Sequence, residues 1–360
     1  MRVVLNRNDD AASPVFLQSK FWAEFKAGSG WTYERYDVGA PEAPGLEPFS
    51  LSVLERSLGG GFRFAYVPHG PAATVPPESR GECLEAIAES MRPNLPRSCV
   101  FIRFDPEWHE AERRQEDDEP SSDYSPSRPL FGTPLRKGSD VQPPDSVVLA
   151  IDRTDDELLA GMKPKWRYNV RLAAKKGVIV ASEGIASLPD FYRLYQTTAA
   201  RDRIAIHPLS YYERLLGQPA ASAAEPVPDI RLWVARYEGE ALAAIITVFY
   251  GEEATYLYGA SSDEHRNLMP AYALQWAAIL AARESGCSTY DFYGIPPVDD
   301  PDHAMSGLYR FKTGFGGEIR HYPGGWDYVF RPLVYLAFRA AERARLFWHK
   351  SVKKRIRRSR

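Results

Sequence analysis

The stretch from Arg231 to Gly294, RLWVARYEGEALAAIITVFYGEEATYLYGASSDEHRNLMPAYALQWAAILAARESGCSTYDFYG, decides the fold that we expect for this chain. Three runs rich in β-branched and aromatic residues are separated by two short turns, which is typical of an antiparallel meander. A run with helical spacing and one more strand-like run follow. The predicted elements are strands Arg231 to Tyr237, Ala241 to Tyr250 and Ala254 to Gly259, helix Pro270 to Glu284, and strand Ser288 to Gly294.

The same order of elements occurs earlier in the chain. Strand-like runs Phe49 to Leu54 and Phe62 to Val67 flank a Gly-Gly-Gly turn, helix Pro77 to Met91 follows, and strand Cys99 to Asp105 comes next. A repeated supersecondary unit indicates an internal duplication. We therefore predict an α/β (α+β) fold with two units, each built around a mixed sheet.

Length and composition agree with two domains. The chain has 360 residues, 44% of them hydrophobic and 12% aromatic, which is more than one compact core usually holds. Neither a secretory signal pattern nor an apolar run of roughly 18 residues is present, so we expect a cytoplasmic protein. Three cysteines lie far apart without metal-ligand spacing, and we expect no structural metal; they are Cys83, Cys99 and Cys287.

Two segments separate the predicted units. Residues 107–138 are polar, charged and rich in Pro and Ser, which predicts an insertion or mobile loop. The strand-like run Val147 to Ile151 comes after it, and we place the domain boundary there.

A basic helix is predicted directly after this boundary. From Leu158 to Ser182 the chain has no acidic residue, and a helix opened by Pro164 carries cations every four residues, at Lys163, Arg167, Arg171 and Lys175. Like charges at this spacing repel by about a few tenths of a kcal/mol per pair. The stripe therefore favours binding of phosphate, nucleic acid above all, as much as it favours a solvated or packing face.

A second candidate site lies in the phrase Gly307 to Gly317, GLYRFKTGFGG. It places Lys312 between Phe311 and a glycine-rich run whose backbone is able to come close to a ligand. A fixed cation in this frame suits an anion or a developing oxyanion. The alternative is a structural strand that ends in a glycine-rich turn.

The order of elements in each half resembles the acyltransferase fold known as GNAT. Members of that fold bind the pyrophosphate of acyl-CoA on a glycine-rich turn before the helix that follows the central strand. The corresponding segments here, residues 259–270 and 70–77, lack a Gly-x-Gly spacing, and Asp263 and Glu264 would repel a pyrophosphate. We therefore expect neither an acyl-CoA donor nor another cofactor.

Several phrases together resemble the FemABX peptidyltransferases, which use aminoacyl-tRNA to add amino acids to peptidoglycan precursors. They occur in the family's order and cover most of the chain except residues 107–138. The phrases are Tyr66 to Pro71 (YVPHGP), Gln142-Pro-Pro, Met162 to Val178 (MKPKWRYNVRLAAKKGV), Tyr258-Gly-Ala-Ser, Tyr290 to Ile295 (YDFYGI) and Gly307 to Gly317.

The resemblance implies two tandem GNAT-like domains, residues 1–148 plus 320–360 and residues 149–319, in the short form of the family that lacks a coiled-coil arm. It also implies an aminoacyltransferase. The donor would be aminoacyl-tRNA, and the acceptor would be the side-chain amine of the third stem-peptide residue of lipid II or UDP-MurNAc-pentapeptide. No nucleophile and base pair is needed, because the donor ester is already activated.

The resemblance also implies site residues. Lys312 would stabilise the oxyanion and the tRNA end, with Phe311 beside it, and the basic helix would contact tRNA or pack between domains. Lys26 would contact the acceptor diphosphate.

For the second diphosphate contact, the family often has an arginine four residues before a tyrosine, and here the matching pair is His207 and Tyr211. Because neutral histidine is a poorer anion partner, Arg201 or Arg203 would substitute. Asp105 and Tyr258 would contact the peptide or its amine, and a turn-capping role beside Pro106 is the alternative for Asp105.

The end of the chain is strongly basic. From Arg339 to Arg360 it has ten Lys or Arg residues against Glu342 alone, interleaved with aromatic and aliphatic residues. This composition suits tRNA phosphates or peripheral contact with the inner face of the cytoplasmic membrane. Two alternative functions stay open: an acyl-CoA- or aminoacyl-tRNA-dependent N-acyltransferase acting on another amine, and a non-catalytic RNA- or envelope-binding protein.

Overall fold

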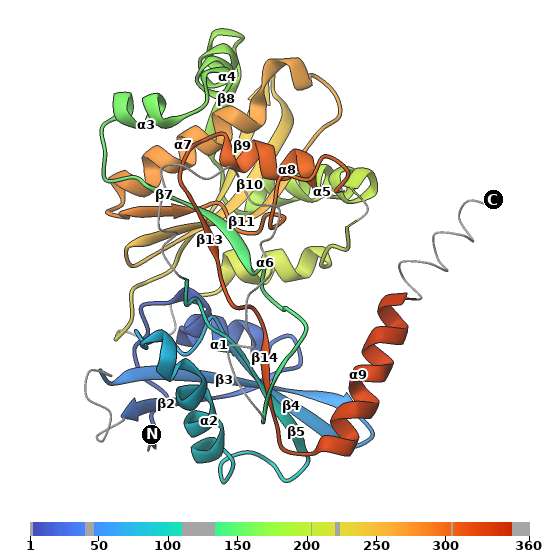
Figure 1. Ribbon diagram of the computed structural model, residues 1–360. Helices are drawn as coiled ribbons and strands as arrows, with labels where there is room; N and C mark the ends of the chain where they lie inside the picture. Colours follow the sequence, from blue (N-terminus) through green and yellow to red (C-terminus); the bar gives the residue numbers. More distant parts are fainter. Residues whose placement is uncertain are drawn as a thin grey trace, which may run out of the picture.

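The computed structural model contains two α/β units, one above the other in Figure 1, and each is built around a seven-stranded mixed sheet. It describes residues 3–39, 47–109, 134–202, 204–219, 224–303 and 305–347. Most of the predicted insertion at 107–138 lies outside these residues. In the part of the chain that is described, no helix combines the length and apolarity needed to cross a membrane.

Sheet A forms the first unit, and its strand order is β1-β2-β3-β4-β5-β14-β6. Strands β1 to β4 are antiparallel neighbours, β5 pairs parallel to β4, and β14 pairs antiparallel to β5 and β6. The bounds are β1 Val4–Arg7, β2 Thr32–Gly39, β3 Phe49–Gly59, β4 Phe62–Pro68, β5 Cys99–Asp105, β6 Leu135–Lys137 and β14 Trp326–Val329.

The turn between β3 and β4 needs glycine, because Gly59, Gly60 and Gly61 all have positive φ. Helix α2 (Arg80–Met91), entered through the 3-10 turn η2 (Pro77–Ser79), makes the crossover from β4 to the parallel β5. It packs on one face of sheet A. Helices α1 (Lys20–Ala27) and α9 (Pro332–Phe347) cover the other face.

Sheet B forms the second unit, in the order β8-β9-β10-β11-β12-β7-β13. Strand β12 pairs parallel to β11 after the crossover helix α7 (Pro270–Glu284), and β7 and β13 continue antiparallel. The bounds are β7 Asp145–Ala150, β8 Ile179–Ser182, β9 Asp229–Tyr237, β10 Glu240–Tyr250, β11 Glu253–Ser261, β12 Thr289–Asp291 and β13 Glu318–His321.

Position by position, the two sheets have the same pattern: four antiparallel strands, one parallel strand, then two antiparallel strands. The predicted duplication and the mixed α/β class are confirmed. The chain leaves sheet A after Lys137 and returns to it at Trp326. Strands β7 and β13 cross the boundaries drawn at 148 and 320, and the division into residues 1–148 plus 320–360 and 149–319 stays a prediction.

The remaining helices belong to the second unit. Helix α3 (Asp155–Gly161) begins with a capping box in which Thr154 accepts from the Glu157 backbone and Glu157 reaches back. Helices α5 (Leu188–Asp202) and α6 (Leu209–Gly217) are short, so the described residues between β8 and β9 contain no long helical arm. Helices α4 (Pro164–Lys175) and α8 (Ser306–Thr313) and the 3-10 turns η1 (Phe16–Gln18), η3 (Ile185–Ser187) and η4 (Arg266–Leu268) complete the set.

The two units are joined through α1 and the segment before it. Phe16, Phe21, Trp22 and Phe25 are buried in one cluster with residues of α5, α6 and β10. A fully buried ion pair, Arg35 with Glu225, also joins β2 to the segment before β9. The aromatic cluster and the buried ion pair therefore set the position of one unit relative to the other.

Candidate active site between the two units

Lys312 lies near the end of α8, with its side chain buried. Its Nζ donates to the carbonyl oxygens of Tyr293, at 2.9 Å, and Gly294, at 2.8 Å, and lies 5.2 Å from the Tyr256 ring centroid. Burial lowers the pKa of Lys312 to about 7, against the opposing attraction of Asp291. A lysine in this state is able to exist as either ammonium or amine near neutral pH.

The segment around Lys312 is a helix, so the alternative of a strand ending in a turn is wrong. Its glycines serve packing rather than anion binding: a Cβ on Gly314 would lie 2.1 Å from Trp166, and one on Gly317 2.8 Å from the Val148 carbonyl oxygen. The amides of Gly314, Phe315 and Gly316 donate to carbonyls within the same segment. They are therefore not available to a ligand.

Phe311 faces inward. Its ring packs on Tyr272 and Phe315, and its carbonyl oxygen accepts from Trp166 Nε1 of α4 at 2.9 Å. These contacts anchor α8 to α4 and support the position of Lys312. The predicted contact of Phe311 with a tRNA end stays a prediction.

The carboxylate of Asp291 lies near Lys312, although the sequence analysis did not select Asp291 as a site residue. Asp291 ends β12, is buried, and accepts from Ser146 Oγ and from the Tyr293 amide at 2.7 Å. Burial raises its pKa, and burial and the charge of Asp291 raise the pKa of Glu253 to about 8. With a pKa of about 8, Glu253 holds a proton at neutral pH, and burial also makes Asp291 a stronger base than an exposed aspartate.

A chain of hydrogen bonds connects this group to the first unit. The Tyr293 hydroxyl donates to Gln142 Oε1, Gln142 Nε2 donates to the Tyr66 hydroxyl at 3.2 Å, and Tyr66 donates to Asp105 Oδ2 at 2.9 Å. The backbone N–H of Gln142 also donates to Asp105 Oδ2, at 3.1 Å. Asp105 is thus bonded to the segment between the units and does not cap a turn at Pro106. Burial raises its pKa.

His69 and Glu107 lie next to this network. Their side chains pair at 2.9 Å, and the His69 ring lies 6.2 Å from that of Tyr293. Burial alone would lower the pKa of His69, but the charge and hydrogen bond of Glu107 raise it to about 9. The His69 imidazole is therefore protonated at neutral pH.

A tyrosine group continues from Tyr293 toward α6. The hydroxyls of Tyr211 and Tyr258 lie 3.1 Å apart, and the His207 ring stacks on Tyr211 with centroids 3.9 Å apart. Burial, followed by nearby tyrosine hydroxyls that include those of Tyr211 and Tyr293, raises the pKa of Tyr258. Burial and the charge of Lys26 lower the pKa of His207, so this ring is neutral at neutral pH.

Lys26 lies at the other end of this group. Its Nζ is held between two indoles, 5.4 Å from the Trp22 ring centroid and 5.7 Å from that of Trp31. Burial lowers its pKa, and so do the charges of Arg56 and Arg214. Among the described residues no carboxylate pairs with Lys26, so this corner has an excess of positive charge.

Arg201 is placed differently from what we expected. It pairs with Asp202 at 2.9 Å and with Asp263 at 2.8 Å, so its charge is neutralised by carboxylates. Arg203 lies outside the described residues. Arg56 and, on α6, Arg214 are instead the arginines whose charges act on Lys26.

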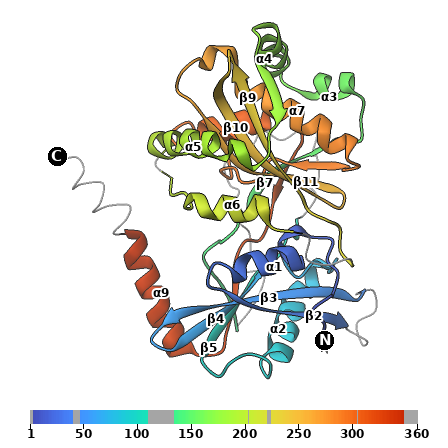
Figure 2. The same ribbon diagram turned by 180° about the vertical axis from the view of Figure 1, so that it is seen from behind.

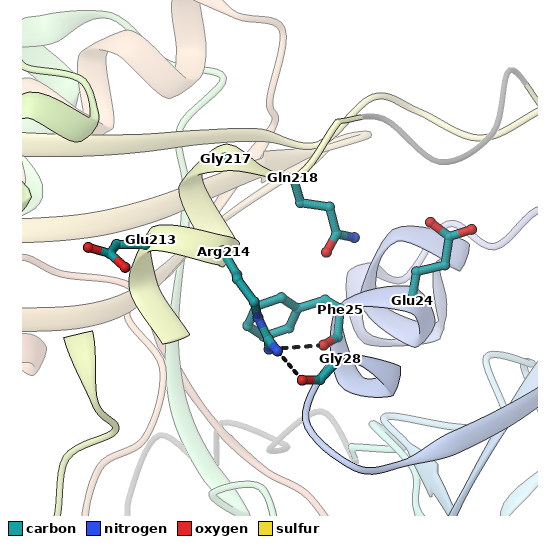
Figure 3. A pocket seen from close by; sticks show the side chains of 7 residues that line it. All are labelled: Glu24, Phe25, Gly28, Glu213, Arg214, Gly217 and Gln218. Atoms are coloured by element: carbon teal, nitrogen blue, oxygen red, sulfur yellow. Dashed lines mark hydrogen bonds between the residues drawn. The ribbon is translucent and has the colours of Figure 1, made fainter. Parts of the chain in front are cut away.

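Figure 3 shows Arg214 reaching the end of α1, where its guanidinium donates to the Phe25 carbonyl at 3.3 Å and to that of Gly28. It also donates to Ser29 Oγ at 2.7 Å. A pocket of about 420 Å³ opens here, lined by Glu24, Phe25, Gly28, Glu213, Arg214, Gly217 and Gln218.

The basic helix α4 lies at the end of the molecule remote from sheet A (Figures 1 and 2). Lys163, Arg171 and Lys175 are exposed. Arg167 instead donates to the carbonyls of Leu159, at 3.3 Å, and Ala160, at 2.9 Å, so it caps the end of α3. Three of the four predicted cations thus form an open face, and one has a structural contact.

The described residues contain one group with the composition of a metal site, Glu240, Glu264 and His265. All three are exposed; Glu240 begins β10, and Glu264 and His265 follow β11. Exposed acidic groups are common without an ion, and we assign no metal to them.

Comparison with known proteins identifies the family. The sequence matches the FemAB family over residues 8–223 and 232–343. The chain belongs to the FemAB family. Two FemAB relatives are the lipid II:glycine glycyltransferases of Staphylococcus saprophyticus, 27% identical, and of Staphylococcus aureus strain USA300, 25% identical. In both comparisons 89% of this chain and 89% of the relative are covered.

The fold agrees with this membership. The crystal structure of FemX superposes with a TM-score of 0.71 at 21% identity, over 91% of this chain and 96% of FemX. The resemblance stated from the sequence is therefore confirmed, and so is a fold of two GNAT-like units. As a FemAB protein with glycyltransferase relatives, the chain is a transferase.

The sequence analysis missed two of the residues that the structure brings together around Lys312 and Asp105. Gln142 and Asp291 lie inside the phrases that pointed to the family, but no role was assigned to them. One signal was available: the central parallel strands β5 and β12 both end in an aspartate, Asp105 and Asp291. Because the two units are duplicates, the selection of Asp105 as a site residue could also have led to Asp291 at the equivalent position.

Proposed function

We propose that this protein transfers an amino acid from aminoacyl-tRNA to the side-chain amine of the third residue of a peptidoglycan precursor stem peptide. The precursor is lipid II or UDP-MurNAc-pentapeptide, and the product is an interpeptide bridge or branch. The observation that carries this proposal is the environment of Lys312. A buried lysine with a pKa of about 7 lies beside a buried carboxylate, within a network that spans both units.

The reaction that fits these groups is aminolysis of an ester. The acceptor amine attacks the ester carbonyl, a C–N bond forms, and the C–O bond to the terminal ribose breaks. The amine proton passes to the carboxylate of Asp291, and the ribose oxygen takes up a proton. Lys312 in its ammonium form offsets the charge of the tetrahedral oxyanion and of the tRNA end.

The remaining groups fit the acceptor. Lys26, with Arg56 and Arg214 nearby, provides a positive corner for the precursor's diphosphate, which offsets the neutrality of His207. Tyr211, Tyr258 and Asp105, which belong to the ring and hydrogen-bond contacts described above, would contact the peptide. The exposed cations of α4 support contact with the tRNA body.

One experiment tests the proposal. The protein is incubated with a mixture of charged tRNAs and, separately, with lipid II and UDP-MurNAc-pentapeptide, and the product masses are read. We expect a gain of one or more amino-acid residues on a precursor, and no gain with deacylated tRNA. A gain that occurs with acetyl-CoA, or no gain on either precursor, would contradict it and favour the alternative acyltransferase or non-catalytic functions.

A further inference from the structure

Helix α9 is held to sheet A by one of its sides. Tyr335 and Phe338 each pack on Phe101, with ring centroids 5.3 Å apart in both pairs. The Tyr335 hydroxyl donates to Asp327 Oδ2 at 2.8 Å, and Arg339 donates to Ser139 Oγ at 2.9 Å. The orientation of the helix about its own axis is therefore defined.

The opposite side of α9 is apolar and exposed. Leu333 is 83% exposed and Leu336 is 57% exposed. At about 100° per residue, three exposed alanines fall on the same side as these leucines. We call this surface the α9 stripe: Leu333, Leu336, Ala337, Ala340 and Ala344.

Nothing among the described residues packs over the α9 stripe. In Figures 1 and 2 the helix stands at the edge of the first unit and points away from both units. Two exposed leucines three positions apart on a surface helix form an apolar patch, and such patches mark interaction sites.

Positive charge adjoins the α9 stripe. Arg343 lies within the same turns and is exposed, and Arg331, just before the helix, is exposed but donates to the Arg97 carbonyl oxygen at 2.9 Å. From Arg339 to the end, the sequence has ten Lys or Arg residues and one Glu. A helix with an aliphatic side and a cationic border is suited to lie flat on an anionic lipid surface, its apolar side among the acyl chains.

The α9 stripe is on the same side of sheet A as Lys26. A series of ring contacts connects them: Trp31, which is under Lys26, contacts Phe64, Phe64 stacks on Phe101, and Phe101 contacts α9. A bilayer in contact with α9 would therefore face the side of the molecule where Lys26 and Arg56 lie.

We propose that the α9 stripe and the basic residues around it dock this protein on a bilayer that contains anionic phospholipid. Leucines gain little from contact with RNA phosphates, whereas acyl chains would bury them. Pairing with a second copy through the α9 stripe would bring two cationic segments together. Lipid binding stands independently, while the orientation of Lys26 toward a lipid-linked acceptor rests on the proposed function.

The test compares vesicles of phosphatidylcholine with and without phosphatidylglycerol, using co-sedimentation of the full chain without substrates. We expect binding only with phosphatidylglycerol. The double variant Leu333→Ser/Leu336→Ser should lower the partition coefficient by about tenfold or more. The matched control, Ile179→Ser/Val227→Ser, removes two exposed aliphatic residues elsewhere, 71% and 66% exposed, and should bind as the original chain does.

The Leu333→Ser/Leu336→Ser variant is also tested for tRNA affinity, for its oligomeric state and for transfer activity, which distinguishes a bilayer from RNA or a second copy as the partner of the α9 stripe. If Leu333→Ser/Leu336→Ser binds vesicles like the original chain, the proposal is overturned. It is also overturned if that variant loses tRNA affinity, or changes a dimer into a monomer in gel filtration, while vesicle binding persists. Transfer to UDP-MurNAc-pentapeptide is measured in parallel. Lost vesicle binding with transfer retained supports the docking surface, and absent transfer in the original chain with vesicle binding retained contradicts only the proposed function.

Discussion

At the scale of residues, the site is a set of buried polar groups whose charges offset one another. Lys312 is bonded to two carbonyl oxygens and attracted by Asp291, which is itself bonded to Ser146. Burial destabilises the charged form of each group, and the neighbouring charges and hydrogen bonds stabilise that form in part. The result is a lysine whose protonation changes near neutral pH, beside a carboxylate whose pKa is raised by burial.

Replacing Lys312 tests its proposed role directly. Lys312→Ala should lower kcat by about 10²- to 10³-fold, because the oxyanion loses its cation. The control Arg310→Ala removes an exposed cation from the same helix, paired with Asp299 at 3.0 Å, and should keep normal turnover. Initial rates with saturating charged tRNA measure both variants, and circular dichroism checks folding. Near-normal turnover of Lys312→Ala would reject the role.

The pKa of Lys312 also predicts how stability depends on pH. Its native pKa is about 7 and the ordinary value is 10.5, so between these values the unfolded chain binds a proton that the native protein lacks. Stability then rises with pH across this interval relative to a Lys312→Met variant. Urea unfolding of both proteins over the interval measures the difference. A constant difference would mean that the pKa of Lys312 is not lowered.

At the scale of elements, the contact between α4 and α8 positions Lys312 and also determines which side of α4 is exposed. The α8 carbonyl oxygens of Phe311 and Gly314 accept from Trp166 and Lys163 at the start of α4. This contact fixes Lys312 and leaves the outer side of α4 free, with Arg171 and Lys175 exposed. The phrase Met162 to Val178 therefore has a packed part, at the start of α4, and an exposed part, which includes Arg171 and Lys175.

The open part of α4 is predicted to contact tRNA. Arg171→Ala/Lys175→Ala should weaken tRNA binding and reduce the slope of log affinity against log salt by about one for each phosphate that the variant no longer neutralises. Lys165→Ala is the control, since it removes an exposed cation from another side of α4. Fluorescence anisotropy over a salt series measures all three proteins. An equal effect in the control would show that the binding is not specific to this face.

At the scale of the whole molecule, the two units act as one body because buried groups join them. Arg35 on β2 pairs with Glu225, which also accepts from the amides of Ser13, at 3.3 Å, and Lys20, at 2.8 Å. This contact and the aromatic cluster around α1 set the relative position of Lys26 and Lys312.

Breaking the Arg35–Glu225 pair should therefore destabilise the protein. Glu225→Gln keeps the shape and leaves a buried guanidinium without its counter-charge, at a cost of about 3 kcal/mol in the free energy of unfolding. Asp155→Asn, which breaks the surface pair with Arg283, should cost about 1 kcal/mol or less. Urea unfolding compares the variants. Equal effects would mean that the buried pair contributes no more than a surface pair.

The order of elements was predictable because it depends on neighbours in sequence. The helix Pro270–Glu284 and the meander before it were both predicted from spacing and turn residues. The duplication and the family phrases followed from the same short segments. Lys312 could be selected in this way because its phrase is continuous.

What surrounds Lys312 was decided only by the tertiary structure. Its carbonyl partners lie 18 and 19 residues away, the bond from Gln142 to Tyr293 spans 151, and that from Arg214 to Gly28 spans 186. No periodicity connects positions this far apart; they meet because two duplicated sheets pack through α1. For the same reason Arg201, expected beside the acceptor, pairs with Asp263, and Arg214 lies beside Lys26 instead. The sequence by itself determined the elements, their duplication and the family, whereas burial and the contact between the units decided which charges face one another.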